Sequence, residues 1–309
     1  MTRRALVLFG LMSLIWGIPY LFIRVAVAEV SPATLVFARS AIAAVILLPI
    51  ALVRGDLRPV LQRWRWVVAF AAVEIGLPWV LLASAEQRVT SSLAGLLVAG
   101  VPLVGTVVAA ATGGRDRVSL TTLLGLLVGL VGVAAIVGVS VDRSNTTALL
   151  AMALVVIGYA VGPAILSRRL SGLPFVGVMA LSLSLCALVY APIAAVQRPA
   201  VMPSPSALGA IAILAVVCTA IAFLLFAALI DEIGPVRATV ITYVNPAVAA
   251  ALGVAVQRDP FTAAMGLGFL LVILGSAFAA RSPSASTTDR RVGGGDDRPA
   301  VAGVDESVA

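Results

Sequence analysis

The chain has 309 residues, of which 61% are hydrophobic and only 11% are charged. Soluble domains are about 45–50% apolar and about 25% charged, so a water-soluble fold of this length could not bury so much apolar surface. The 21 basic residues are all arginines, and they are scattered between apolar runs rather than clustered. The net charge of +7 therefore indicates membrane topology and not a nucleic-acid partner.

Ten apolar runs of about 20 residues are each long enough to form a membrane-spanning helix. They cover residues 5–28, 33–53, 66–85, 90–112, 118–140, 147–167, 174–196, 207–230, 236–256 and 262–280. Because these runs are too uniformly apolar for the strands of a barrel, the sequence predicts an all-α integral membrane protein. The first run is too long for a cleaved signal peptide, so we expect a retained helix. The polar tail at 281–309 is predicted to be a disordered cytoplasmic segment.

The distribution of arginines predicts the orientation in the membrane. If the N-terminus is cytoplasmic, the outer loops hold only Arg88, Arg143, Arg198 and Arg258. The inner segments then hold Arg3, Arg4, Arg54, Arg58, Arg63, Arg65, Arg115, Arg117, Arg168, Arg169 and the arginines of the tail. The positive-inside rule thus places both termini in the cytoplasm. Trp64 and Trp66 are expected to anchor the third helix at the inner interface.

The chain also repeats itself. Residues 81–102 align without gaps on residues 225–246 at an offset of 144, which pairs Pro102 with Pro246. At an offset of 143, Trp16 falls on Tyr159 and Gly125 on Gly268. The sequence therefore predicts one five-helix unit over 1–142 and a second over 143–280. Because five is odd, the second unit must enter the membrane with the opposite orientation, as in many secondary transporters.

These features resemble the EamA family of the drug/metabolite transporter superfamily. The resemblance rests on the doubled order of an aromatic in the first helix, a proline in the fourth and a glycine-patterned fifth helix, together with the stretches SPATLVFARS (31–40) and SSLAGLLVAGVPL (91–103). It implies ten helices and secondary transport of small metabolites, often export. Arg39 departs from the doubling, because the equivalent segment 176–184 has no basic residue.

Glu74 is the most informative polar residue, since it lies about 12 Å deep in an apolar core about 30 Å thick. A carboxylate at that depth must face the bundle interior, find a partner or be protonated. It is either a site for a proton or a substrate amine, or a structural group that is neutral or paired with Arg39. Pro78 removes the helical hydrogen bond to the carbonyl of Glu74, so we expect a kink there. Trp79, next along, either stacks on a substrate or packs.

Arg39 is too deep to reach the interface easily, so it is expected to face the interior, where it could bind a substrate carboxylate or neutralise Glu74. Aromatic side chains with polar tips suit a mostly apolar pocket, although each could equally serve packing. Asn245, polar at depth, should find a partner on another helix. The remaining candidates for the substrate or proton pathway are Trp16, Tyr20, Tyr159 and Tyr243.

Several classes of activity lack their residues. The chain contains no His and no Lys, its two cysteines (Cys186 and Cys218) stand in apolar runs, and no nucleophile motif or nucleotide-binding loop occurs. We therefore expect no catalytic residues, no metal and no cofactor. The sequence predicts a multi-pass secondary transporter of the inner membrane, embedded in lipid as a monomer or homodimer and acting on a small molecule. A non-transporting scaffold or an enzyme acting on lipid head groups is the alternative.

Overall fold

The computed structural model describes residues 2–111, 120–140, 145–234 and 238–280. Every regular element within these ranges is a helix, which confirms the all-α fold. The helices are α1 (Arg3–Ile15), α2 (Pro19–Val27), α3 (Pro32–Val53), α4 (Leu57–Leu61), α5 (Trp64–Phe70), α6 (Leu77–Glu86), α7 (Ser91–Val98), α8 (Val101–Ala111), α9 (Leu120–Ser140), α10 (Thr146–Arg169), α11 (Phe175–Val196), α12 (Pro205–Ala212), α13 (Ala222–Ile233), α15 (Asn245–Gln257) and α16 (Ala263–Ala280). Two π-helical segments, η1 (Ala71–Gly76) and η3 (Ile213–Ile221), and the 3-10 segment η4 (Thr239–Tyr243) complete them.

These elements form ten spans, numbered here in chain order. Within the described ranges nine are long and apolar enough to cross a membrane, and the tenth contains a shorter apolar stretch, Ala263–Phe278. Three spans are broken between two helical elements: α1 and α2, α7 and α8, and η4 and α15. Each break lies just before a proline (Pro19, Pro102 or Pro246), because proline has no N–H to continue the helical ladder. The third span joins α5, η1 and α6, and the eighth joins α12, η3 and α13.

Polar caps fix where three spans begin. The side chains of Ser31, Thr90 and Ser204 accept hydrogen bonds from the backbone N–H three residues later, and so start α3, α7 and α12. Proline follows Ser31 and Ser204 at the first helical position, where its missing N–H costs nothing. Ser31 and Pro32 together therefore mark a helix start.

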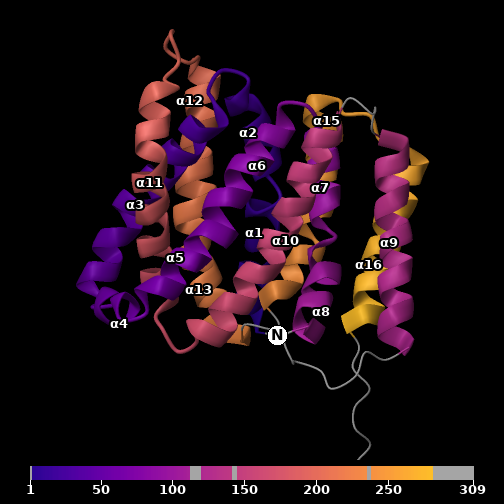
Figure 1. Cartoon of the computed structure of the whole chain (residues 1–309), viewed down its shortest axis with the longest axis horizontal. Coiled ribbons are helices and arrows are strands. Elements are labelled where there is room, and N and C mark those ends of the chain that lie inside the picture. Colours follow the sequence, from indigo (N-terminus) through magenta and orange to yellow (C-terminus); the bar gives the residue numbers. More distant parts are fainter. Residues whose placement is uncertain (1, 112–119, 141–144, 235–237, 281–309) are drawn as a thin grey trace, which may run out of the picture.

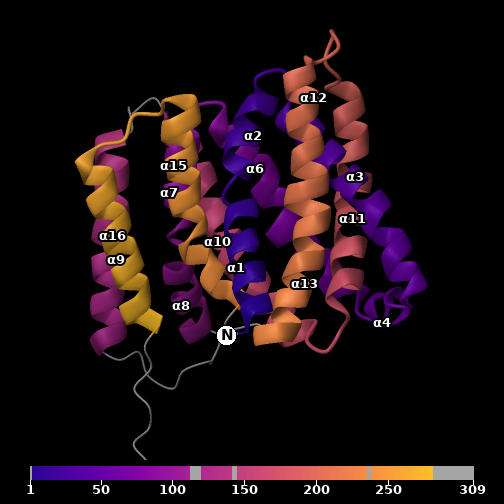
Figure 2. The same cartoon turned by 180° about the vertical axis from the view of Figure 1, so that it is seen from behind.

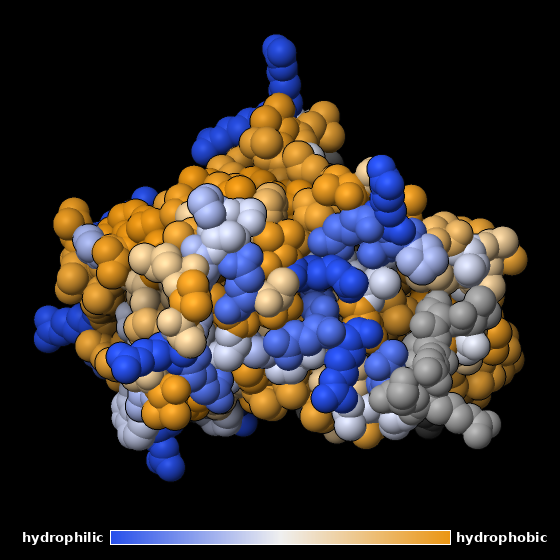
Figure 3. All heavy atoms as spheres, turned by 90° about the horizontal axis from the view of Figure 1, so that it is seen from above, coloured by the Kyte–Doolittle hydropathy of each residue, from blue (hydrophilic) through white to orange (hydrophobic). Residues whose placement is uncertain are grey.

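The outer surface fits lipid as its solvent. Large apolar side chains stay exposed along the helices, including Leu130 at 62% and Leu188 at 71% of their surface. Viewed from the end where α12 and α15 lie, apolar residues form much of the rim, and hydrophilic residues gather in the middle (Figure 3). The start of α1 and the end of α16 lie together at the opposite end (Figure 1). The tail predicted to be disordered lies outside the described residues.

The two halves are joined helix to helix (Figures 1 and 2). The second, fourth and fifth spans each pack against their own counterpart, so α3 meets α11, α7 meets α15, and α9 meets α16. The other contacts are crossed, because α1 of the first span packs on α13 of the eighth and α6 of the third span packs on α10 of the sixth. Exchanging the halves turns each crossed pair into the other, as expected for a two-fold relation between inverted repeats.

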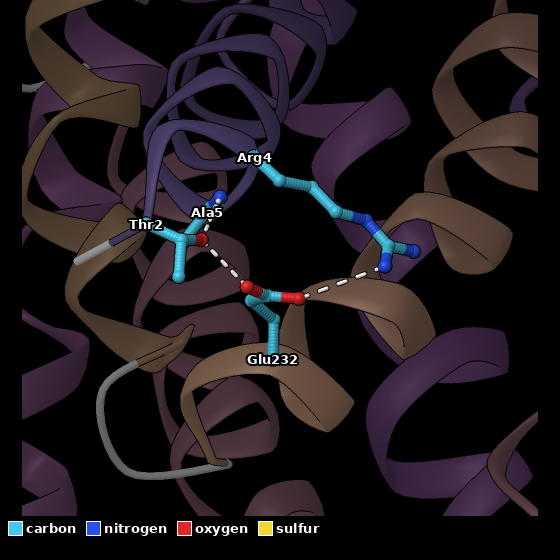
Figure 4. Close-up of polar contacts among 4 residues, drawn as sticks. All are labelled: Thr2, Arg4, Ala5 and Glu232. Carbon is cyan, nitrogen blue, oxygen red and sulfur yellow. Dashed lines mark hydrogen bonds and ion pairs between the residues drawn. The ribbon is translucent and has the colours of Figure 1, made fainter.

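Polar contacts tie each crossed pair at both ends. In the first pair, Glu232 near the end of α13 accepts a hydrogen bond from Thr2 at 2.5 Å and lies 3.7 Å from Arg4 (Figure 4). At the opposite end, Glu29 accepts hydrogen bonds from the backbone N–H of Ser204 at 2.6 Å and from its hydroxyl at 2.5 Å. The first span is thereby fastened to the eighth at both membrane faces.

The second crossed pair has equivalent ties. Arg63, just before α5, donates to the carbonyl of Arg169 at the end of α10, with 2.7 Å between the atoms. Arg88, just after α6, donates to the hydroxyl of Thr147 near the start of α10, also at 2.7 Å. The third and sixth spans are therefore antiparallel, and each crossed pair is held as a unit by contacts at both ends.

The tie at Glu29 is expected to respond to acid. The hydroxyl and then the backbone N–H of Ser204 hold the pKa of the Glu29 carboxyl below its usual value of about 4.3. A depressed pKa means that the contact is present at neutral pH and is lost as the pH falls through the lowered value. Spin labels on Ala28 and Met202 should therefore move apart as the pH is lowered through the depressed pKa of Glu29. Glu29→Ala should show the longer distance at neutral pH, and an unchanged distance in both experiments would contradict the assignment.

Close backbone contact between α9 and α16 depends on glycine. A Cβ on Gly275 would lie 2.6 Å from the carbonyl oxygen of Gly125, and one on Gly132 would lie 2.6 Å from the carbonyl oxygen of Gly268. Both approaches involve main chain, which cannot move aside as the tip of a side chain can. The glycine pattern of the fifth helix thus allows the two helices to touch.

Gly275→Ala should lower the melting temperature of the purified protein, because overpacking costs about 1–3 kcal/mol. Gly138→Ala is the matched control, since it lies on α9 with open space around its added Cβ. Alanine at that position should be neutral or slightly stabilising through its helix propensity. Equal melting temperatures for the two variants would show that the close contact contributes nothing.

Candidate functional site

Arg39 lies within α3, and its side chain is compensated by two other spans. Its Nε donates a hydrogen bond to the hydroxyl of Thr219 on η3 at 2.7 Å. The guanidinium carbon also lies 3.7 Å from the centre of the Trp79 ring on α6. Only 8% of the residue is exposed. A hydrogen bond to a charged donor and a cation–π contact are both strong in a site with little water, so they hold the guanidinium in the bundle.

Two tyrosines interact electrostatically with this arginine. Tyr159 of α10 lies close to the Trp79 indole and interacts electrostatically with Arg39 and Glu74. Tyr20 of α2 is buried and interacts with Arg39 and with Tyr159. Five of the residues singled out in the sequence therefore meet in one buried polar cluster. This cluster joins the first, second, third, sixth and eighth spans.

Glu74 stands on η1 and turns toward the second half of the chain. Its Oε2 atom is buried and has no hydrogen-bond partner among the described residues. The carboxylate and Cβ of Glu74 occupy the space that a Cβ on Gly162 of α10 would need. Within the described ranges Glu74 forms no ion pair with Arg39. The Nε of Arg39 donates a hydrogen bond to Thr219. In this conformation the carboxyl is therefore available for a proton or a cation.

The helix around Glu74 is wound more loosely than an α-helix. Pro78 occupies the second position of α6, directly after the π-helical segment η1. The N–H of Leu77 donates to the carbonyl of Ala72, five residues earlier. This wider π-helical turn makes room for the ring of Pro78, which cannot take part in the usual α-helical hydrogen bond. The eighth span carries the longer segment η3 at the matching offset, although it contains no proline there. Such π segments are frequent at functional sites.

Three other candidates lie away from this cluster. Trp16 packs on Phe226 and Phe223 of α13, with ring centres 4.8 Å and 6.1 Å apart. Asn245 ties the ninth span to the first when its side-chain amide is oriented with the nitrogen toward the carbonyl of Ser13, 3.1 Å away. That contact provides the partner on another helix that its depth requires. Tyr243 is half-buried in η4.

Two polar residues of the site were missed by the sequence reasoning. Thr219 reads as one small residue in an apolar run, and only the fold shows that it meets Arg39, 180 positions away. Glu86 marks the end of α6, where a loop was expected, but only 1% of it is exposed. Its Oε2 accepts from Ser91 at 3.3 Å, and its Oε1 has no partner in the described part of the chain. Because Glu86 lies at the predicted end of a span, the sequence did not indicate that its carboxyl is buried.

Around Glu86 the polar cluster extends toward one membrane face. Glu86 interacts electrostatically with Tyr20 and with Asp259, of which 7% is exposed. Asp259, between α15 and α16, accepts a hydrogen bond from the backbone N–H of Ser92 at 3.0 Å. Two further buried carboxyl groups, Glu86 and Asp259, thus lie at this end of the bundle.

Thr219→Val should destabilise the protein, because it leaves the buried Arg39 without its hydrogen-bond acceptor. The loss of a hydrogen bond to a charged group costs about 1.5–3 kcal/mol, which thermal unfolding in detergent would detect. Thr106→Val is a suitable control. Both hydroxyls donate to a carbonyl on their own span, to Leu214 and Pro102 respectively, but only Thr219 contacts a charge. If both variants melt alike, Thr219 does not support Arg39.

Ten helical spans in two related halves, enclosing buried opposite charges, define a membrane transporter built from repeats. The chain belongs to the EamA-like transporter family, whose model matches it twice, over residues 3–138 and 146–281. The family resemblance and the doubling predicted from the sequence are thereby confirmed.

Individual proteins agree with this assignment. The chain is 30% identical over 262 residues to the uncharacterized inner membrane transporter YedA of Escherichia coli K12, covering 81% of this chain and 83% of that protein. The YedA sequence of Escherichia coli O157:H7 matches to the same extent. A protein solved by crystallography shares the fold with a TM-score of 0.64 at 23% identity, and the match covers 91% of this chain and 97% of the other.

Proposed function

We propose that this chain is a secondary active transporter that moves a small metabolite across the cytoplasmic membrane by alternating access. The observation that carries the proposal is the Glu74 carboxyl, whose Oε2 is buried without a hydrogen-bond partner in the described part of the chain, on a loosened helix that faces the other repeat. A scaffold needs no such group, because an unpaired carboxyl in the membrane only lowers stability. An enzyme would need a nucleophile and a base together.

The proposed movement follows from the crossed pairs. The first and eighth spans are tied at both ends, as are the third and sixth, so each pair can move as a unit. Rocking one pair against the other would open the polar cluster first to one face and then to the other. The π segments η1 and η3 lie on one member of each pair, where a looser helix can adjust its register.

The charges of the cluster indicate what the site can bind. Arg39 offers a planar cation to a carboxylate or phosphate, and it would have to exchange its bond with Thr219 for one with substrate. Glu74 offers a carboxyl to a proton or to a substrate amine. The aromatic rings of Trp79 and Tyr159 add apolar surface with polar edges. We propose a small polar or amphipathic metabolite, carried either with proton coupling or by exchange.

The direction and orientation rest on the family and the charge pattern. Export is the direction that the family resemblance favours, and the arginine distribution supports cytoplasmic termini in the inner membrane. In right-side-out vesicles, substrate efflux from the lumen would support export if a substrate gradient of the same size in the opposite direction drives no uptake. A broad panel of metabolites with no flux above empty vesicles would favour the scaffold.

If Glu74 binds the coupling proton, Glu74→Gln should remove the response of flux to an imposed pH gradient, because glutamine stays neutral at every pH. The measurement is uptake into proteoliposomes with and without the gradient. Asp231→Asn is the control, since Asp231 is an exposed carboxyl elsewhere on the protein. A variant that keeps the pH response of the unmodified protein would rule out Glu74 as the coupling site. Loss of all binding would instead indicate a substrate contact.

A further inference from the structure

A basic hollow lies where the third span begins and the sixth span ends. Its volume is about 380 Å³, and it is outside the polar cluster described above. The residues that line it are Gln62, Arg63, Trp64, Arg65, Trp66, Arg168 and Arg169. The two ends meet here because Arg63 donates to the carbonyl of Arg169. Four arginines and two tryptophans thus share one small surface.

The lining is arranged for an anion. No carboxylate is among the residues that form the hollow. The guanidinium of Arg169 lies 4.5 Å from the centre of the Trp66 ring, which holds its position without neutralising its charge. Neighbouring arginines repel one another, so an anion between them would relieve that repulsion. Guanidinium groups match the oxygen geometry of phosphate particularly well.

An apolar hollow adjoins the basic one. Its volume is about 580 Å³, and Gln62 lines both. The other lining residues are Leu52, Gly55, Leu57, Arg58 and Leu61. Leu52 and Leu61 are 59% and 51% exposed, and Trp64 is 57% exposed. Exposed tryptophan beside exposed leucine and arginine is typical of a membrane interface. The two hollows together offer a charged pocket next to an apolar groove.

We propose that this surface binds an anionic phospholipid, with the phosphate in the arginine pocket and acyl chains against the apolar groove. A free phosphate would occupy only the basic hollow, whereas a lipid would occupy both. Lipid is also present at the membrane interface, where the ends of the spans lie. Clusters of arginine beside spans are the usual recognition element for such lipids. The site is separate from the proposed transport pathway, so it stands whether or not the chain transports. By fastening one end of the third–sixth pair, bound lipid would also support that pair.

The test is a titration of the purified protein in detergent with dioleoyl phosphatidylglycerol, followed by native mass spectrometry. Arg65→Gln and Arg169→Gln should each weaken binding about fivefold, the effect expected for one arginine near a lipid surface. Arg3→Gln is the matched control, because Arg3 is an exposed arginine outside the hollow, near the membrane face where α1 begins. That variant should bind lipid as the unmodified protein does.

Two further arms decide the source of the anion. Phosphatidylcholine should bind much more weakly than phosphatidylglycerol, and inorganic phosphate at matched ionic strength should not displace the lipid. Displacement by phosphate, or equal binding of both lipids, would overturn the proposal. So would equal affinities for Arg65→Gln, Arg169→Gln and Arg3→Gln. Melting curves for each variant without lipid would confirm that the exposed substitutions leave the fold intact.

Discussion

The arrangement of the site depends on how one permanent charge is held in the membrane. Arginine cannot lose its proton in a protein, so Arg39 has to be compensated by its neighbours. Thr219 supplies an acceptor and Trp79 a ring face, while Tyr20 and Tyr159 lie near enough to interact electrostatically with the same guanidinium. These contacts bring five spans together around one group. Among the described residues Glu74 forms no ion pair with this arginine.

The two repeats are related by symmetry, but the polar cluster between them is not symmetric. An offset of 143 pairs Trp16 with Tyr159 and an offset of 144 pairs Trp79 with Phe223, so the two crossed contacts are related. One of them is purely apolar, since Trp16 packs on Phe223, whereas Tyr159 and Trp79 contact charges. Arg39 likewise corresponds to Ser182, which is buried and uncharged. The two repeats pack in similar ways, but only the first repeat contributes charged residues to the polar cluster.

Hydropathy and spacing predicted the spans because each span is a local property of about 20 residues. Glu74 and Arg39 could be recognised for the same reason, as charges inside apolar runs. The breaks before Pro19 and Pro246 follow from proline, but η3 contains no proline and gave no local signal. Thr219 and Glu86 owe their roles to packing between distant spans. A sequence pattern cannot indicate which small hydroxyl will meet an arginine from the other half.

The hydrogen bond between Arg39 and Thr219 also has a consequence for how the chain is made. Synthesis proceeds at about 5–20 residues per second, and 180 residues separate the two partners. The second span therefore waits roughly 10 to 40 seconds for the acceptor of its guanidinium. Gly162, which lies beside Glu74, is also made only after the first half is complete. The first half must therefore be inserted while Arg39 has only Trp79 and Tyr20 of its own half beside it.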